Sequence, residues 1–109
     1  MMNKNNNSIL GNMEIAAFCD QLSVIVAAGI SLYEGVSILS EDAEDEQTKV
    51  ILSGINASLE QGVSFHEALS ASEVFPKYVI DMIEIGETTG KLEEVLKALS
   101  TYYRREDSI

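Results

Sequence analysis

Three glycine-marked corners restrict what this chain of 109 residues can fold into. Two of them repeat one Gly-x-Ser-x-x-Glu pattern about 33 residues apart. The glycine suits the end of one helix, because it adopts a positive φ without steric cost. The Ser-x-x-Glu spacing is that of a capping box, in which the hydroxyl and the carboxylate accept hydrogen bonds from free N–H groups of the next helix. The residues are Gly29, Ser31 and Glu34 in the first corner, and Gly62, Ser64 and Glu67 in the second.

The third corner lies at residues 75–92 and follows another pattern. Pro76, the only proline, suits the first position of a helix, where its missing N–H is not needed. Gly86 and Gly90 bracket a tight turn, and a glycine there allows a positive φ or the close approach of another backbone. We predict an architectural corner without chemistry of its own. One apolar face of the helix before it carries Val79, Met82, Ile83 and Gly86.

Glu87 is the charged residue of this third turn. We predict that its carboxylate accepts hydrogen bonds from free N–H groups of a nearby helix start. The alternative is a contact with a partner protein. We expect its loss to loosen the packing between the last two helices.

Apolar residues recur at spacings of three and four, which predicts helices throughout the chain. We predict an all-α domain over residues 13–107: an antiparallel six-helix bundle built from three helical hairpins. Residues 1–12 form a polar tail that we expect to be disordered. A solenoid of helical repeats is a weaker alternative, because its aromatic signature is absent.

The net charge is −11, from 18 acidic and 7 basic residues. This balance argues against nucleic acid as a partner, because phosphates require a basic surface. Five of the six residues at 41–46 are acidic and stand at the expected start of the third helix, where the helix dipole favours negative charge. We interpret the run as a solvated segment; the alternatives are a surface for a basic partner and a loose divalent-cation site. Its acidic residues are Glu41, Asp42, Glu44, Asp45 and Glu46.

The sequence contains none of the common motifs of catalytic or nucleotide-binding sites. His66, the only histidine, lies beside Glu67 at a spacing that keeps their side chains apart on a helix. Cys19, the only cysteine, is predicted to be a small buried apolar residue. We therefore predict a protein that is not an enzyme and that binds no cofactor.

The three corners together resemble the cytoplasmic domain of the F-type inner-membrane platform proteins of type II secretion systems and type IV pili. The resemblance covers residues 13 to about 105. It departs from the family pattern at Thr89, where serine is more usual, and in lacking an N-terminal extension. The matching residues are Phe18, Leu22, Ala28-Gly29-Ile30-Ser31-Leu32, Gly35-Val36, Gly62-Val63-Ser64-Phe65, Glu67-Ala68-Leu69, Phe75-Pro76, Met82-Ile83, Gly86-Glu87, Gly90, Leu92, Leu96 and Tyr102.

This resemblance implies a non-enzymatic scaffold, a soluble domain at the cytoplasmic face of the inner membrane within a membrane-embedded parent protein. It implies that the parent couples an assembly ATPase to pilin or pseudopilin subunits, and that the domain self-associates as a homodimer. The segment Tyr102-Tyr103-Arg104-Arg105 would lead into the first membrane span. The alternative is a free-standing soluble helical adaptor that binds a basic protein through residues 41–46. A small enzyme that uses His66 is the weakest alternative.

Overall fold

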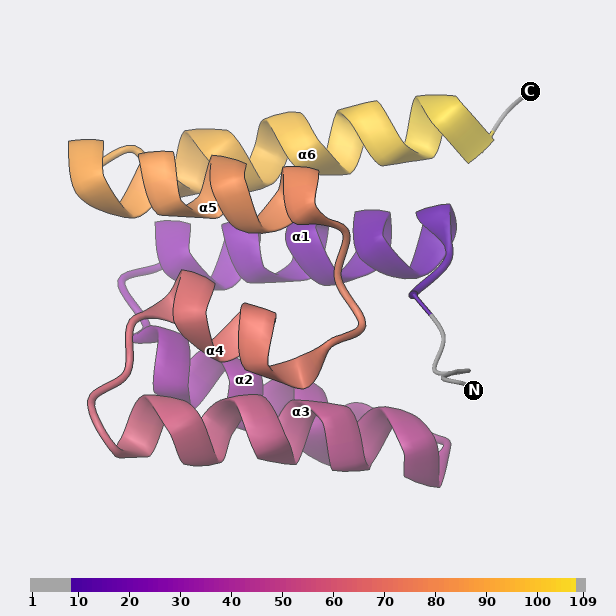
Figure 1. Ribbon diagram of the computed structural model, residues 1–109, viewed down its shortest axis with the longest axis vertical. Coiled ribbons are helices and arrows are strands. Elements are labelled where there is room, and N and C mark those ends of the chain that lie inside the picture. The colour runs from indigo at the N-terminus through magenta and orange to yellow at the C-terminus, as the bar shows by residue number, and fades with distance from the viewer. Residues whose placement is uncertain (1–8, 108–109) are drawn as a thin grey trace.

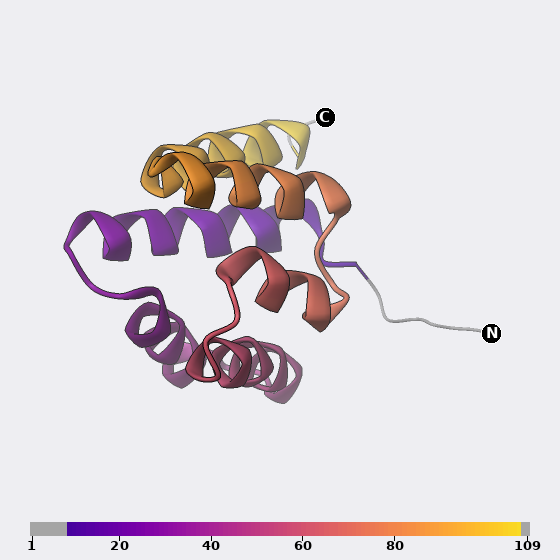
Figure 2. The same ribbon diagram turned by 60° about the vertical axis from the view of Figure 1, so that its left-hand side comes forward.

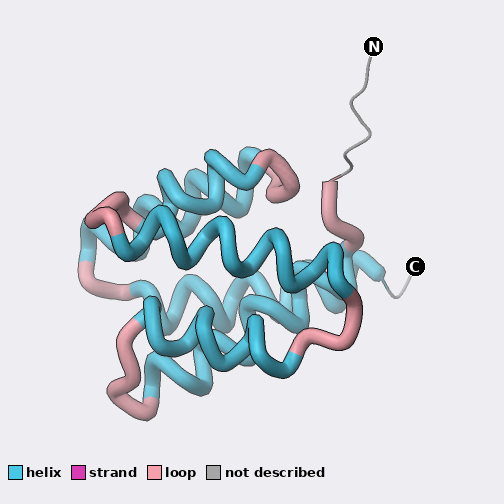
Figure 3. The backbone as a smooth tube through the Cα atoms, turned by 90° about the horizontal axis from the view of Figure 1, so that it is seen from below, coloured by secondary structure: helices cyan, strands magenta, loops and turns pink. Residues whose placement is uncertain are grey.

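The computed structural model describes residues 9–107, and these residues form helices and loops without a strand. Short loops join consecutive helices (Figure 3). The predicted all-α class is therefore confirmed. The helices are α1 (Asn12–Ala27), α2 (Leu32–Asp42), α3 (Glu46–Glu60), α4 (Phe65–Ser72), α5 (Lys77–Thr89) and α6 (Leu92–Asp107).

The helices form two layers, with α1, α5 and α6 in one and α2, α3 and α4 in the other (Figures 1 and 2). Each helix contacts the next one along the chain, and α1 closes the ring by packing along α6. The α1–α6 contact is the most extensive in the bundle, and the α1–α2 contact is the least extensive of the six main ones. The structure therefore confirms a helical bundle but does not confirm its division into three hairpins.

The core lies between the two layers and is built from the apolar faces predicted by the helical spacing. Phe18 of α1 reaches both Phe65 and Phe75, with ring centroids 6.4 and 5.1 Å apart. Cys19 is fully buried, as predicted for a small apolar residue. The largest fully buried apolar side chains are Ile15, Leu22, Val36, Ile55, Phe65, Leu69, Val79, Ile83, Leu96 and Leu99.

Gly29 and Gly62 end α1 and α3 in the same way, with φ angles of 84° and 89°. At the first corner the amide of Ile30 donates to the carbonyl of Ile25, and the amide of Gly29 donates to that of Val26. The second corner repeats this pair of bonds at equivalent positions. This is the Schellman arrangement, which satisfies the last carbonyls of a helix and requires the left-handed conformation at the glycine.

The third corner differs from the prediction, because α5 continues through Gly86 and Glu87 to Thr89. The chain reverses only at Gly90, which has a φ of 73°. Gly86 is instead required for close approach: a Cβ there would lie 3.0 Å from Val95 Cγ2 and 3.1 Å from the Cα of Leu92. The two glycines of the predicted turn therefore serve separate purposes, one for helix packing and one for the turn.

Two boundaries also differ from the expected ones. Pro76 stands one residue earlier than predicted, at the N-cap of α5, where its carbonyl accepts from the amides of Val79 and Ile80. The predicted polar tail falls largely on residues 1–8, which lie outside the described residues. After it, the amide of Leu10 donates to the carbonyl of Val74 at 2.8 Å, so this segment is attached to the α4–α5 connection.

Gly86→Ala should destabilise the domain by about 1–3 kcal/mol, because the added methyl group must push α5 away from α6. The matched control is Gly54→Ala in α3, where an added Cβ meets nothing within 4 Å. Gly54→Ala should be neutral or stabilising by up to about 1 kcal/mol, since alanine is the better helix former. Urea unfolding measures both free energies, and equal effects at the two sites would contradict the close approach at Gly86.

Candidate functional site

The carboxylate of Glu87, in the last turn of α5, accepts hydrogen bonds at the N-terminus of α4. Its Oε2 accepts from the amide of Phe65 at 2.8 Å, and its Oε1 accepts from the amide of His66 at 3.0 Å. The carboxylate thus accepts from a nearby helix start, that of α4, and it joins α5 to α4. The effect of its loss was expected between the last two helices, α5 and α6, which is a different pair. Since α5 is helical up to Thr89, the side chain of Glu87 leaves a regular helix and reaches the other layer.

The first turn of α4 has all of its amide donors satisfied. Glu87 takes the amides of Phe65 and His66, Ser64 Oγ accepts from the amide of Glu67 at 3.3 Å, and the Ser64 carbonyl accepts from that of Ala68 at 2.9 Å. A helix start leaves its first amides without partners inside the helix, and a buried one needs partners from elsewhere. Phe65 is 1% exposed, so its amide is shielded from water, whereas Ser64 and His66 are partly buried.

His66 completes the junction between α4 and α5. Its Nδ1 lies 2.6 Å from Glu87 Oε1, and its Nε2 lies 3.8 Å from Glu84 Oε2. The hydrogen bond with Glu87 raises the pKa of His66, partial burial opposes this effect, and the charge of Glu84 adds to it. Partial burial acts to raise the pKa of Glu87, but hydrogen bonds from the ring and amide of His66 and from the amide of Phe65 outweigh it and lower the pKa.

Sequence reasoning did not find the His66–Glu87 pair. The two residues are 21 positions apart, whereas the acidic neighbour of His66 in the sequence is Glu67. The signal that points to the pair is the Glu-x-x-Glu spacing of Glu84 and Glu87, which puts two carboxylates on one side of α5. The packing of α5 on α4 then determines which side chain they meet.

In both predicted capping boxes the hydrogen bond to the serine hydroxyl forms. Ser31 Oγ accepts from the amide of Glu34 at 3.1 Å, as Ser64 does from that of Glu67. The carboxylate of Glu67 instead accepts from the Ser64 hydroxyl at 3.0 Å. The glutamate half of such a box occurs at α1, where Glu14 Oε1 accepts from the amide of Gly11 at 2.8 Å.

The acidic run at 41–46 joins α2 to α3, and its side chains have different roles. Asp45 is the N-cap of α3: its carboxylate accepts from the amide of Thr48 at 3.0 Å and from the Thr48 hydroxyl at 2.7 Å, and these bonds lower its pKa. Glu41, Glu44 and Glu46 are exposed. No group of three or more histidine, cysteine or acidic side chains is arranged to hold a metal ion within residues 9–107.

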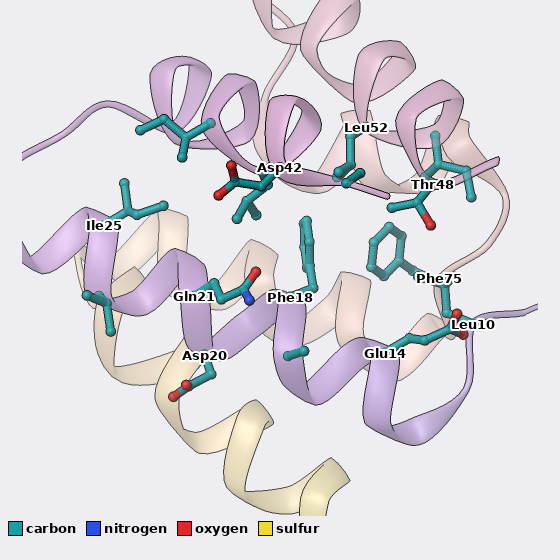
Figure 4. Close-up of a pocket in the computed structure, with 16 residues that line it drawn as sticks. Leu10, Glu14, Phe18, Asp20, Gln21, Ile25, Asp42, Thr48, Leu52 and Phe75 are labelled. Carbon is teal, nitrogen blue, oxygen red and sulfur yellow. The ribbon is translucent and has the colours of Figure 1, made fainter. Parts of the chain in front are cut away.

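A groove of about 590 Å³ opens between α1 on one side and α2 and α3 on the other (Figure 4). Buried apolar side chains form its floor, and Val24 and Ile38 are exposed at its edges, by 63% and 37%. The charged residues that line it are all acidic: Glu14, Asp20 and Asp42. The buried floor residues are Phe18, Leu39, Leu52 and Phe75.

The thiol of Cys19 and the apolar character of the helices are two further features of the described residues. Burial raises the pKa of the Cys19 thiol to about 12, so this residue is not a reactive thiolate near neutral pH. None of the helices within residues 9–107 combines the length and the apolar character that crossing a membrane requires.

Comparison with known proteins gives the family. The family described as "Type II secretion system (T2SS), protein F" matches residues 18–109. The type IV pilus assembly protein PilC of Thermus thermophilus is 30% identical over 96 residues, which cover 88% of this chain and 24% of that protein. The HofC homolog of Escherichia coli, described as a protein transport protein, is 43% identical over 75 residues, covering 68% of this chain and 19% of that protein. Type II secretion system protein F of Xanthomonas campestris is 28% identical over 95 residues, 86% of this chain and 24% of that protein.

This chain belongs to the type II secretion system protein F family. The resemblance seen in the sequence is confirmed, and the relatives are components of type II secretion and type IV pilus assembly. The chain spans about a quarter or less of the length of these relatives.

Glu87→Ala should destabilise the domain by about 2 kcal/mol, because it leaves two amides of a partly buried helix start without side-chain partners. The matched control is Glu44→Ala, which removes an exposed carboxylate from a loop and should change the free energy of unfolding by less than about 0.5 kcal/mol. Thermal or urea unfolding measures both. If the two variants were equally stable, the carboxylate of Glu87 would not be holding α4.

The stabilisation from the His66–Glu87 pair should depend on pH. Because the pKa of His66 is raised in the folded state, its contribution is complete below the ordinary value of 6.5 and falls as the pH rises through the folded pKa. Because the pKa of Glu87 is lowered, its contribution is complete above the ordinary value of 4.5 and is lost as the pH falls through the folded pKa. The free-energy difference between the parent and His66→Ala should therefore be largest between these two values.

His66 is the only histidine. A change near neutral pH in the difference in free energy of unfolding between the parent and His66→Ala therefore belongs to this residue. Unfolding in urea at pH 5.5 and pH 8.5 provides the comparison. A difference of the same size at both pH values would show that the charged form of His66 contributes nothing.

Proposed function

We propose that this chain is a non-enzymatic scaffold domain of an inner-membrane platform protein in type II secretion or type IV pilus biogenesis. In this proposal the domain lies at the cytoplasmic face of the membrane, and the parent couples an assembly ATPase to pilin or pseudopilin subunits. The observation that carries the proposal is the family match over residues 18–109, together with relatives named for both secretion and pilus assembly.

The chemistry of the described residues supports a scaffold. His66 is engaged with Glu87 at the start of α4, and Cys19 is a buried thiol with a raised pKa. The two side chains with the strongest potential for acid–base or nucleophilic catalysis are therefore part of the packing. Binding of other subunits then depends on the surface, and that surface is acidic overall, with a net charge of −11.

We further propose that the exposed acidic residues of the α2–α3 connection contact the ATPase. All five acidic residues are exposed, but Asp45 holds the N-terminus of α3 and Asp42 lines the groove, which leaves Glu41, Glu44 and Glu46 for this contact. Exposed carboxylates steer a basic surface of a partner during association and fix its register. A homodimer of this domain is part of the same proposal.

The test is binding of this chain, and of the full-length parent protein, to the cognate assembly ATPase. Replacing Glu41, Glu44 and Glu46 by glutamine should weaken binding by about tenfold or more, because three steering charges are lost. The matched control replaces Glu93, Glu94 and Glu106 of α6 by glutamine; it makes the same change in net charge at another exposed surface and should change the affinity by less than about twofold. If neither the chain nor the parent bound any assembly subunit, the scaffold role would be wrong. Equal weakening by both triple variants would move the contact away from the α2–α3 connection.

A further inference from the structure

The groove between α1 and the α2–α3 pair exists because α1 is packed unequally on its two sides. Its contact with α6 is the most extensive in the bundle, and its contact with α2 is the least extensive of the main ones. Apolar side chains on the open side are therefore incompletely covered: Val24 is 63% exposed, and Ile38 faces the same groove with 37% exposed. A single exposed apolar residue needs no explanation, but exposed apolar residues beside an apolar hollow indicate a binding surface.

The shape of the groove matches a helix. The α1 residues that line it recur at spacings of three and four, so they form one stripe along the helix. This stripe spans about three turns, or about 16 Å at 1.5 Å per residue. A partner helix of three or more turns presents its own apolar residues at the same spacing and anchors them in such a hollow. The residues of the stripe are Glu14, Ala17, Phe18, Gln21, Val24 and Ile25, and the seventh lining residue of α1, Asp20, stands at its edge.

The charge around the groove indicates what kind of helix fits. The charged residues that line both walls are acidic, with Glu14 and Asp20 on α1 and Asp42 on α2, and the lining residues include no lysine, arginine or histidine. The carboxylate of Asp20 points away from the gap (Figure 4). In Figure 4 the carboxylate of Asp42 lies in the gap, opposite Gln21 of α1. Basic residues beside the apolar face of a bound helix would meet these carboxylates, whereas acidic ones would be repelled. A second copy of this chain is a poor occupant of this groove for the same reason, because its charged residues are mostly acidic, 18 against 7 basic; the homodimer of the proposed function would use another surface.

We propose that this groove binds an amphipathic helix of a partner protein, with apolar side chains inserted between α1 and α2–α3 and with lysine or arginine residues paired to Asp42. The inference concerns a surface separate from Glu41, Glu44 and Glu46. It stands whether or not the partner is the ATPase of the proposed function.

The test uses this chain and fluorescent synthetic helices as probes. The first probe is an amphipathic peptide of leucine and lysine, about five turns long, which is enough to span the stripe. The second replaces every lysine by glutamate, and the third has the composition of the first in scrambled order, without an apolar face. The first probe should bind about tenfold or more tightly than either of the others, because only it matches both the apolar floor and the acidic rim.

Two matched pairs of variants locate the binding. Val24→Lys should weaken binding of the leucine–lysine peptide by about tenfold or more, because it places a charge at the apolar edge. Its control is Val50→Lys on α3, which alters a valine that is 68% exposed and outside the groove, and which should have less than about a twofold effect. Asp42→Asn should also weaken binding, and Glu41→Gln, which alters the neighbouring exposed residue outside the groove, should weaken it less.

Each remaining outcome contradicts the proposal. Equal weakening by Val24→Lys and Val50→Lys, or equal binding of the scrambled peptide, would show a non-specific attraction between charges. Sedimentation of the chain alone tests the other occupant: a dimer that Val24→Lys converts to a monomer, and Val50→Lys does not, would assign the groove to a second copy. Circular dichroism shows whether each variant keeps the helical content of the parent. Ile38→Lys, at the opposite edge of the groove, should weaken binding of the leucine–lysine peptide as Val24→Lys does, which gives a second folded variant for the test.

Discussion

The hydrogen bonds from the start of α4 to the carboxylate of Glu87 join the two layers of this domain. α4 has only eight residues, and a helix of that length is not stable by itself in water. It lies between α3 and α5 and contributes Phe65 and Leu69 to the core, so it must be held in place for the core to form. A single carboxylate takes two of its first amides and also contacts the ring of His66. Because hydrogen bonds to a charged acceptor are stronger than neutral ones, this contact is well suited to hold a short helix that buries one face.

The two repeated corners differ in how the start of the following helix is capped. Both use a left-handed glycine followed by a capping serine, at Gly29 and Ser31 and at Gly62 and Ser64. Only the second corner is completed by a carboxylate from another helix. This difference follows from position, because α4 packs directly on α5, whereas α2 lies at the weakly packed side of α1. That weakly packed side is also where the groove opens, so the small contact between α1 and α2 leaves a surface available for partners.

The sequence allowed prediction of the helices and the core, because both depend on local spacing. Residues such as Phe18, Leu22 and Ile83 occupy the apolar faces that the three–four pattern indicates, and the chain must bury those faces. The end of α5 was predicted wrongly, because Gly86 looks like a turn glycine in the sequence. Its actual requirement arises from tertiary packing, because a Cβ at this position would lie 3.1 Å from the Cα of Leu92 in α6. The His66–Glu87 pair and the groove were not predicted for the same reason, since each depends on how helices distant in the sequence are placed.

The most direct test of this account is native-state amide hydrogen exchange at Phe65 and His66, in the parent and in Glu87→Gln. The variant keeps the size of the side chain and removes its charge. The account predicts that both amides are protected in the parent and exchange about tenfold or more faster in the variant, while the amide of Glu34, which is held by Ser31 in α2, is unchanged. Equal exchange of Phe65 and His66 in the two proteins would show that the carboxylate does not hold α4, and would contradict the account.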